Sequence, residues 1–123
     1  MRRPMTICDI FDVAVVPFPL VDPAFASPRP VLVLSARGFN AAAGHTVLAM
    51  ITTGAGTSKA FDFQIRDPAA AGLPSPAIVR WKILTLENAL IARRLGRLGA
   101  ADRAALELLP WQAAVTAEQR DIA

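Results

Sequence analysis

Short runs of β-branched and apolar residues, separated by segments rich in proline and glycine, dominate the pattern along the chain. Runs of this kind predict β-strands bounded by turns. Five strands are expected in the first 84 residues: 12–18, 30–35, 45–53, 61–65 and 77–84. The run at 30–35 is apolar on both faces, which is typical of a strand in the middle of a sheet. Gly38 and Gly44 bracket an expected turn region between the second and third strands.

Alternation along a strand predicts which side chains share a face. In the fourth strand it places the apolar side chains together, namely Phe61, Phe63 and Ile65. In the fifth strand it places Arg80 and Lys82 on one face, with Trp81 pointing inward from the other.

Beyond Thr85 the pattern allows two structures. Residues 86–91 form a helical turn followed by a sixth strand at 93–98, or both segments form one helix. Residues 101–109 are expected to be helical, with Asp102 in the first turn, where a negative charge suits the helix dipole, and with Pro110 ending or kinking the helix. Short strands followed by a helix predict one domain over residues 1–123, mainly β with α: a small β-barrel with a C-terminal helix and short helical turns.

Composition argues against a membrane protein and against a metal site. The hydrophobic fraction is 54%, but the best apolar run, 13–21, contains two prolines and is far shorter than the roughly 20 residues a span needs. Asp9 and Asp12 interrupt what would be the apolar part of an export signal. The single cysteine, Cys8, and single histidine, His45, cannot form a disulfide or an ordinary metal site. We expect a soluble, cytoplasmic protein with no metal and no cofactor.

Positive charge is concentrated in arginine. The net charge is +3, and eleven of the thirteen basic residues are arginines, whose guanidinium suits phosphate. Five basic residues lie close together with a single acid, Glu87, among them: Arg80, Lys82, Arg93, Arg94 and Arg97. This stretch fits a phosphate track, a solvated basic face or a surface for an acidic protein equally well.

Familiar catalytic patterns do not explain the sequence. A two-histidine ribonuclease is excluded by the histidine count, and no serine carries the glycines of a nucleophile elbow. The glycine pair 54–56 lacks the lysine and the following helix of a phosphate-binding loop. Paired carboxylates for glycoside hydrolysis are not obvious either.

What remains is an arginine and a hydroxyl pair. Arg29 stands between Pro28 and Pro30 at the expected start of the second strand, and Thr52–Thr53 at the end of the third. If these strands pair antiparallel, Arg29 and Thr52 lie at the same end of the sheet. Taken singly, each is better explained as an ordinary surface arginine or strand threonine.

Seven segments occur in an order and spacing that change this balance: Asp12 to Pro19, Arg29 to Ser35, Phe39–Asn40, Ala49 to Thr52, Ala71 to Leu73, Arg80 to Thr85 and Leu95 to Leu98. Together they resemble the MazF/PemK family, the toxins of type II toxin–antitoxin modules. The resemblance implies an SH3-like barrel with helices that works as a homodimer. It also implies a metal-independent, sequence-specific endoribonuclease that cleaves single-stranded RNA such as mRNA, and a cognate antitoxin as partner.

The resemblance also assigns roles to residues. The family's catalytic arginine falls on Arg29 and its catalytic threonine on Thr52. Its RNA-contacting strand falls on 80–85, which makes Arg80 and Lys82 the expected contacts to the RNA backbone. Thr53 and Asp22 are further candidates for RNA binding, and Asp22, in the long loop after the first strand, is also a speculative proton acceptor.

Three positions depart from the family pattern. The glycine usual before the first strand's aspartate is Phe11, which we expect to concern packing only. A second basic residue often precedes the family arginine, where this chain has Pro28. The serine common before the fifth strand's apolar run is Ala77. The last two lie near the expected site and could lower activity or change the RNA sequence that is cut.

Two other functions stay open at this stage. The chain could be a non-catalytic barrel that binds RNA or protein, or a toxin of the same fold that acts on a protein such as gyrase. The arginine–threonine pair favours RNA cleavage, because a protein-directed toxin has no need of it.

Overall fold

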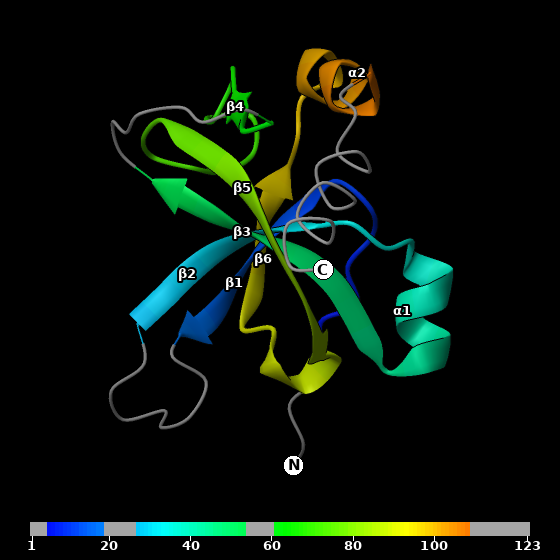
Figure 1. The fold of residues 1–123 in the computed structure, drawn as a ribbon. Helices are drawn as coiled ribbons and strands as arrows, with labels where there is room; N and C mark the ends of the chain where they lie inside the picture. Colours follow the sequence, from blue (N-terminus) through cyan, green and yellow to red (C-terminus); the bar gives the residue numbers. More distant parts are fainter. Residues whose placement is uncertain (1–4, 19–26, 54–60, 109–123) are drawn as a thin grey trace, which may run out of the picture.

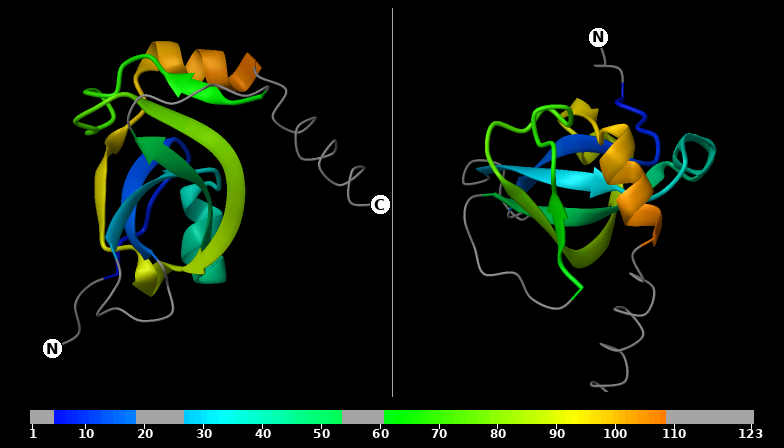
Figure 2. Two further views of the ribbon diagram at one scale, coloured as in Figure 1. Left: turned by 60° about the vertical axis from the view of Figure 1, so that its left-hand side comes forward. Right: turned by 90° about the horizontal axis from the view of Figure 1, so that it is seen from above.

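The structure is a computed structural model, and it describes residues 5–18, 27–53 and 61–108. Six antiparallel strands form one sheet in the order β4-β5-β3-β2-β1-β6, which curls strongly upon itself (Figures 1 and 2). The elements are β1 (Asp12–Phe18), β2 (Ser27–Val33), α1 (Arg37–Ala43), β3 (His45–Thr53), β4 (Phe63–Ile65), β5 (Ala77–Glu87), the 3-10 helix η2 (Asn88–Leu90), β6 (Arg93–Arg97) and α2 (Ala100–Leu108). The expected mainly β fold with a C-terminal helix is confirmed.

Strands β1 and β3 have the bounds that the sequence predicts, and the open question beyond Thr85 is settled in favour of a strand. Strand β5 continues to Glu87, one turn of 3-10 helix follows, and β6 pairs with β1 at the edge of the sheet. Strand β2 differs more, because it begins at Ser27 and ends at Val33, whereas 30–35 was expected.

The turn expected between Gly38 and Gly44 is wrong, because this segment is the helix α1. Its sequence ends in three alanines, which have the highest helix propensity. Gly44 ends it in the left-handed conformation at φ 74°, and its N–H donates to the carbonyl of Asn40. The helix packs beside the start of β3 (Figure 1).

The expected face of Phe61 is also wrong. Strand β4 begins only at Phe63, so alternation does not extend back to residue 61. Phe61 has a left-handed φ of 73° and is 41% exposed, whereas Phe63 and Ile65 are buried.

Two clusters of buried side chains occupy the two faces of the sheet. The first core cluster lies under β4 and α2, and its members include Val13, Leu32, Ala49, Ile51, Phe63, Val79, Trp81, Leu98 and Leu106. The second core cluster is formed by Cys8, Ala14, Val16, Val31, Val33, Leu48, Leu86 and Ile91. Neighbouring residues of β2 and β3 alternate between the two clusters, as pleating requires. Burying each of the larger side chains stabilises the fold by roughly 1.5–3 kcal/mol.

Helix α2 is fixed to the sheet by one apolar and one polar residue. Leu106 packs into the first core cluster, and Asp102 is fully buried on the same helix. The Asp102 carboxylate accepts hydrogen bonds from the backbone N–H groups of Arg66 at 2.9 Å and Asp67 at 3.0 Å. The helix therefore lies across one end of the curled sheet, as Figure 2 shows. None of the helices in the described part of the chain is long and apolar enough to cross a membrane.

A backbone contact between two glycines joins the turn before β5 to β6. Gly72 has a φ of +78°, and a Cβ built there would collide with the carbonyl of Leu95. A Cβ on Gly96 would lie 2.7 Å from the carbonyl carbon and oxygen of Ala71. Both positions therefore require glycine for space, and Gly72 also requires it for its conformation.

We predict that Gly72→Ala lowers the free energy of unfolding by about 2–4 kcal/mol, through left-handed strain and overpacking against β6. Gly38→Ala is the matched control, because nothing lies within 4 Å of its Cβ position and the residue is helical. That variant should gain about 0.5–1 kcal/mol. Urea denaturation measures both, and equal effects of the two variants would contradict the packing described here.

Phe11 shows why a glycine is usual at its position. Its φ is 72°, and its backbone is held there by the hydrogen bonds from its N–H to Val33 and from the N–H of Leu98 to its carbonyl, both 3.0 Å. The expectation that this departure concerns packing only is therefore incomplete, because the position also demands a left-handed backbone. The ring packs against the first core cluster, which offsets the strain.

We predict that Phe11→Gly and Phe11→Ala both destabilise the protein, because both remove the ring. Phe11→Gly should be the more stable of the two by about 1 kcal/mol, since glycine adopts the left-handed conformation without strain. Thermal unfolding of the two variants side by side tests this difference. An alanine variant at least as stable as the glycine variant would be the contrary result.

Candidate active site

Arg29 is the third residue of β2 and is exposed. It pairs with Val16 of β1, and the prolines on either side pair with Pro17 and Val15. Within the described residues, the ladder between β2 and β3 runs from Val33 only as far as Val31, which pairs with Met50. Pro28 and Pro30 have no backbone N–H to donate, so β2 cannot continue a regular ladder with β3 beyond this point.

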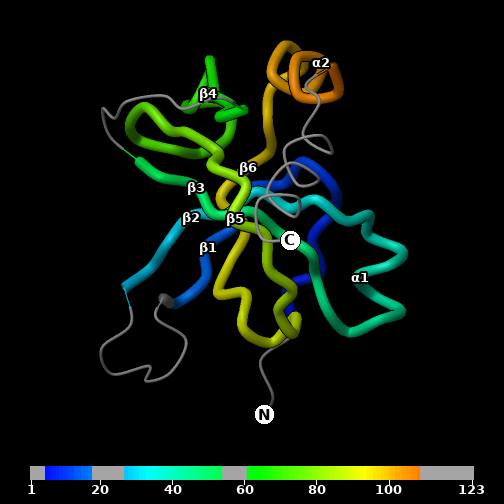
Figure 3. The backbone as a smooth tube through the Cα atoms, viewed as in Figure 1, coloured from blue at the N-terminus to red at the C-terminus, as the bar shows by residue number. Residues whose placement is uncertain are grey.

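The two strands diverge where the ladder stops (Figures 1 and 3). Strand β3 continues to Thr53 and is paired there with β5, through Thr52 with Ile78 and Thr53 with Ala77. Continued by two residues, the β2–β3 register would set Arg29 opposite Thr52. The prediction that these two residues lie at the same end of an antiparallel pair therefore agrees with the strand pairing.

Alternation separates the two threonines. Thr52 follows Leu48 and Met50 on the face of the second core cluster, and Arg29 precedes Val31 on that same face. Thr53 follows Ile51 on the opposite face. The fold therefore brings Arg29 and Thr52 to one face of the sheet, and it does not bring Thr53 there.

Strand β5 carries an irregularity beside Met50. Val79 pairs with Ile51 and Ile83 with Ala49, so the single residue Met50 lies opposite three residues of β5, Arg80 to Lys82. Trp81 is buried in the first core cluster, as predicted, and has a left-handed φ of 58°. Arg80 and Lys82 flank it and are both accessible, with Lys82 exposed. These two cations therefore border the Thr52 side of the sheet.

The five basic residues of 80–97 do not form a uniform phosphate track. Three of them pair with acids that lie earlier in the sequence: Arg94 with Asp12 at 3.0 Å, Arg80 with Asp62 at 3.7 Å, and Arg97 with Asp9 at 3.9 Å. In the described ranges no ion pair joins Lys82 or Arg93, and both are exposed. Of these five residues, Lys82 and Arg93 are therefore the two whose charge is not paired with a carboxylate of the described residues.

Asp9 and Asp12 act as acceptors around the start of β1. The Asp12 carboxylate accepts the N–H of Asp9 at 2.8 Å, and the Asp9 carboxylate accepts those of Arg37 and Ile10. These backbone hydrogen bonds, from Arg37 first and then Ile10, lower the pKa of Asp9. Both carboxylates therefore hold the start of β1 through backbone hydrogen bonds. They also form ion pairs with Arg94 and Arg97, which lie more than 80 residues later in the sequence.

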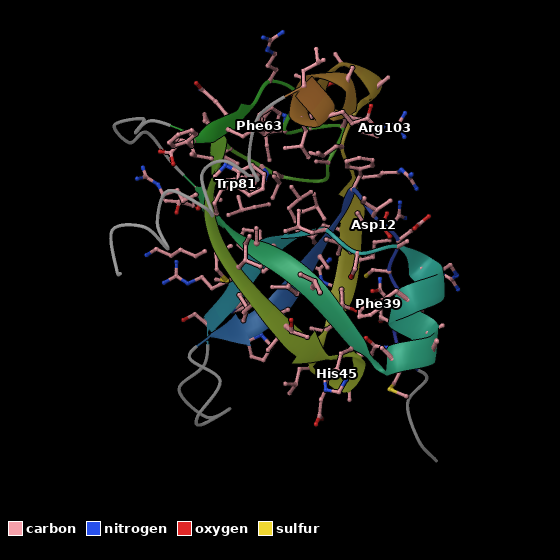
Figure 4. All side chains as sticks on the ribbon, turned by 45° about the vertical axis from the view of Figure 1, so that its right-hand side comes forward. Asp12, Phe39, His45, Phe63, Trp81 and Arg103 are labelled. Atoms are coloured by element: carbon pink, nitrogen blue, oxygen red, sulfur yellow. The ribbon has the colours of Figure 1, made fainter. Side chains whose placement is uncertain are left out.

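Three further residues singled out in the sequence are His45, Cys8 and Asp22. His45 is exposed at the start of β3, where it pairs with Glu87, at the opposite end of the sheet from Trp81 (Figure 4). Cys8 is buried, and burial, followed by the nearby charge of Asp12, raises the pKa of its thiol to about 11. It is therefore no nucleophile. Asp22 lies outside the described residues.

Groups suited to bind a metal ion do not gather in the part of the chain that the structure describes: no three of its histidine, cysteine, aspartate or glutamate side chains are placed to hold one. The groups that the fold collects are a guanidinium, a hydroxyl and an ammonium. These can stabilise negative charge on a phosphate without a metal.

Sequence reasoning missed Asp62 and Met50. Asp62 lies 18 residues before Arg80, and only the folded sheet shows that its carboxylate faces that guanidinium. Met50 has the sequence pattern of an ordinary apolar strand residue. Its position opposite the irregularity in β5 follows from the register of β3 with β5, which the sequence alone does not give.

Comparison with known proteins is consistent with this arrangement. The family model described as "PemK-like, MazF-like toxin of type II toxin-antitoxin system" matches residues 9–108. A comparison with curated protein sequences gives no match.

Solved structures share the fold. The Mycobacterium tuberculosis toxin MazF-mt6 superposes with a TM-score of 0.63 at 23% identity, over 78% of this chain and 88% of that chain. A MazE–MazF structure from Deinococcus radiodurans gives 0.61 at 21% identity, over 80% and 86%. A mycobacterial endoribonuclease in complex with its cognate antitoxin gives 0.66 at 16% identity, over 87% and 94%.

The expected barrel fold is thus the one that MazF proteins have. The family match covers most of the chain, from just before β1 to the end of α2. The chain therefore belongs to the PemK-like, MazF-like toxins of type II toxin–antitoxin systems.

Proposed function

We propose that this toxin is a metal-independent, sequence-specific endoribonuclease that cleaves single-stranded RNA, mRNA included, and thereby inhibits translation in the cytoplasm. The observation that carries the proposal is the projection of Arg29 and Thr52 from one face of the sheet, where β2 and β3 diverge. Family membership supports it, and the resemblance of the sequence to that family assigns the catalytic arginine and threonine to these two positions.

The reaction uses the RNA's own 2′-hydroxyl. Its oxygen attacks the adjacent phosphorus and loses its proton, the bond from phosphorus to the 5′ oxygen breaks, and that oxygen takes up a proton. The products are a 2′,3′-cyclic phosphate and a 5′-hydroxyl end. Negative charge builds on the non-bridging oxygens in the transition state, and donors fixed beside them lower its energy.

Arg29 and Thr52 divide this work. The Arg29 guanidinium clamps the phosphate with charge-assisted hydrogen bonds, and the Thr52 hydroxyl donates to the same group. Proton transfer by Arg29 is secondary, because a guanidinium holds its proton too tightly to be a good acid or base. The prolines at 28 and 30 restrict the backbone around Arg29, so less ordering is needed when RNA binds.

The flanking cations would hold the RNA chain. Lys82 on β5 is exposed and can take a phosphate beside the cleaved bond. Arg80 borders the same face, and Asp22 stays a candidate in the loop after β1. Thr53 points from the opposite face of β3. The RNA chain would have to bend around the end of this strand to contact it.

We also propose a cognate antitoxin and a second copy of this chain as partners, with no cofactor. The antitoxin is supported by the relatives solved with theirs, the MazE–MazF pair and the mycobacterial complex. The homodimer follows from family membership.

We predict site-specific cleavage of RNA by the purified protein in EDTA. Arg29→Ala and Thr52→Ala should each lower the rate about 10²–10³-fold, because each removes a donor to the transition state. The matched controls are Arg66→Ala, an exposed arginine beyond β4, and Thr53→Ala on the opposite face. Both controls should stay within about tenfold of the wild-type rate.

End mapping completes this test, with 5′-hydroxyl ends expected. Absence of cleavage across long, varied RNA would contradict the proposal. Growth arrest on expression would then indicate a toxin with a protein target, and normal growth a non-catalytic binding module.

A second prediction concerns the paired and unpaired cations. Lys82→Ala should weaken RNA binding and reduce the slope of log affinity against log salt by about 0.7. Arg93→Ala should leave the slope nearly unchanged, because Arg93 pairs with Val15 and so lies on the face opposite Arg29. Arg94→Ala should leave the slope nearly unchanged, because Asp12 already neutralises that guanidinium. Equal slopes in all three variants, measured by fluorescence anisotropy, would contradict this division.

A further inference from the structure

The bulge formed by Arg80, Trp81 and Lys82 is not required by the pairing of β5. Three residues lie opposite Met50 alone, and regular pairing resumes at once with Ile83 opposite Ala49. A strand without the two extra residues would satisfy the same ladder. Bulges of this kind turn side chains in new directions, and they are frequent beside functional sites.

Two neighbouring residues before β4 hold this bulge in place. The indole Nε1 of Trp81 donates to the carbonyl of Phe61 at 2.6 Å. The carboxylate of Asp62 lies 3.7 Å from Nη1 of Arg80, with only 6% of its side chain exposed. Residues 61–62 therefore engage residues 80–81 through one hydrogen bond and one ion pair.

Backbone strain collects at this contact. Phe61 and Trp81 both have left-handed φ angles, 73° and 58°, which L side chains rarely adopt. Such strain persists only where the surroundings fix the conformation, and it gathers at sites of binding and catalysis. Here the buried indole, its hydrogen bond and the ion pair provide that fixation.

The two cations of the bulge differ in a way that suggests different tasks. Arg80 lies 3.7 Å from a buried carboxylate and only 21% of its side chain is exposed, so its guanidinium has fewer accessible orientations than that of a fully exposed arginine. A guanidinium restricted in this way suits a base edge with two adjacent acceptors, such as the O6 and N7 atoms of guanine. Lys82 is exposed with no ion pair in the described ranges, and a mobile point charge suits a phosphate.

We propose that this bulge reads the RNA sequence: Arg80 contacts a base that carries two adjacent acceptors, Asp62 is the positioning residue for Arg80, and Lys82 contacts the RNA backbone. The inference rests on the proposed ribonuclease function and deepens it. It changes the expected role of Arg80 from a backbone contact to a base contact.

The test compares sequence preference rather than rate. Full-length wild type, Asp62→Asn and Arg80→Lys are each given one pool of random single-stranded RNA, and the cut sites are sequenced. Asp62→Asn keeps the size of the side chain and removes its charge. Arg80→Lys keeps the positive charge and removes the guanidinium, whose two parallel N–H groups could bind two acceptors at once. Each should reduce the preference for guanine at one position about tenfold or more.

Lys82→Ala is the matched control. It should lower kcat/KM on all sequences alike and leave the preferred sequence unchanged. Asp62→Glu, which restores a carboxylate, should recover part of the preference. Because preference is a ratio within one sample, partial unfolding of a variant does not move it.

Two results would overturn the inference, and they are distinguishable. If the wild type cuts at a defined sequence and both Asp62→Asn and Arg80→Lys keep that sequence, the bulge does not read bases, while the ribonuclease function stands. If the wild type neither cuts nor binds the pool, the proposed function fails and the inference fails with it.

Discussion

The missing backbone N–H groups of Pro28 and Pro30 decide where β2 and β3 part. Beyond the pair Val31–Met50 the two strands no longer form a ladder. Each stays paired on its other side, β2 with β1 and β3 with β5. The two strands therefore diverge while each keeps its other partner. Arg29 and Thr52 lie beyond the last paired residues, and alternation places both on one face of the sheet.

Support for this arrangement comes from tight packing elsewhere. Gly72 and Gly96 let the turn before β5 approach the backbone of β6, and Asp102 fixes α2 to residues 66–67. Strained residues are tolerated where hydrogen bonds or core contacts hold them, as at Phe11 and Trp81. The sheet therefore presents its polar side chains from a backbone that has little freedom to shift.

Local pattern predicted the strands well because β1 and β3 are β-branched runs with clear turn signals on either side. It missed α1, because a helix of seven residues that contains Gly38 and ends at Gly44 has too few turns for a helical period to show. It placed Phe61 on the wrong face, since alternation fails where the backbone turns left-handed. The prediction that Arg29 and Thr52 lie at the same end of the sheet was correct because it required only that β2 and β3, which are consecutive in the sequence before and after α1, pair antiparallel.

Charge pairing could not be predicted in the same way. Asp9, Asp12 and Asp62 meet their arginines only in the folded protein. Of the five cations in the stretch, three are therefore paired, and two, Lys82 and Arg93, have no ion pair within the described residues. The two extra residues in β5 were likewise invisible, because a bulge depends on the register of the neighbouring strand.

The central claim is that Arg29 and Thr52 act on one phosphate, and a double-mutant cycle on RNA cleavage tests it most directly. Groups that stabilise the same transition state act as a unit, so their losses do not multiply. We expect Arg29→Ala/Thr52→Ala to be no more than about tenfold slower than the slower single variant. Losses that multiply in full would show that the two side chains act independently, and would contradict the account.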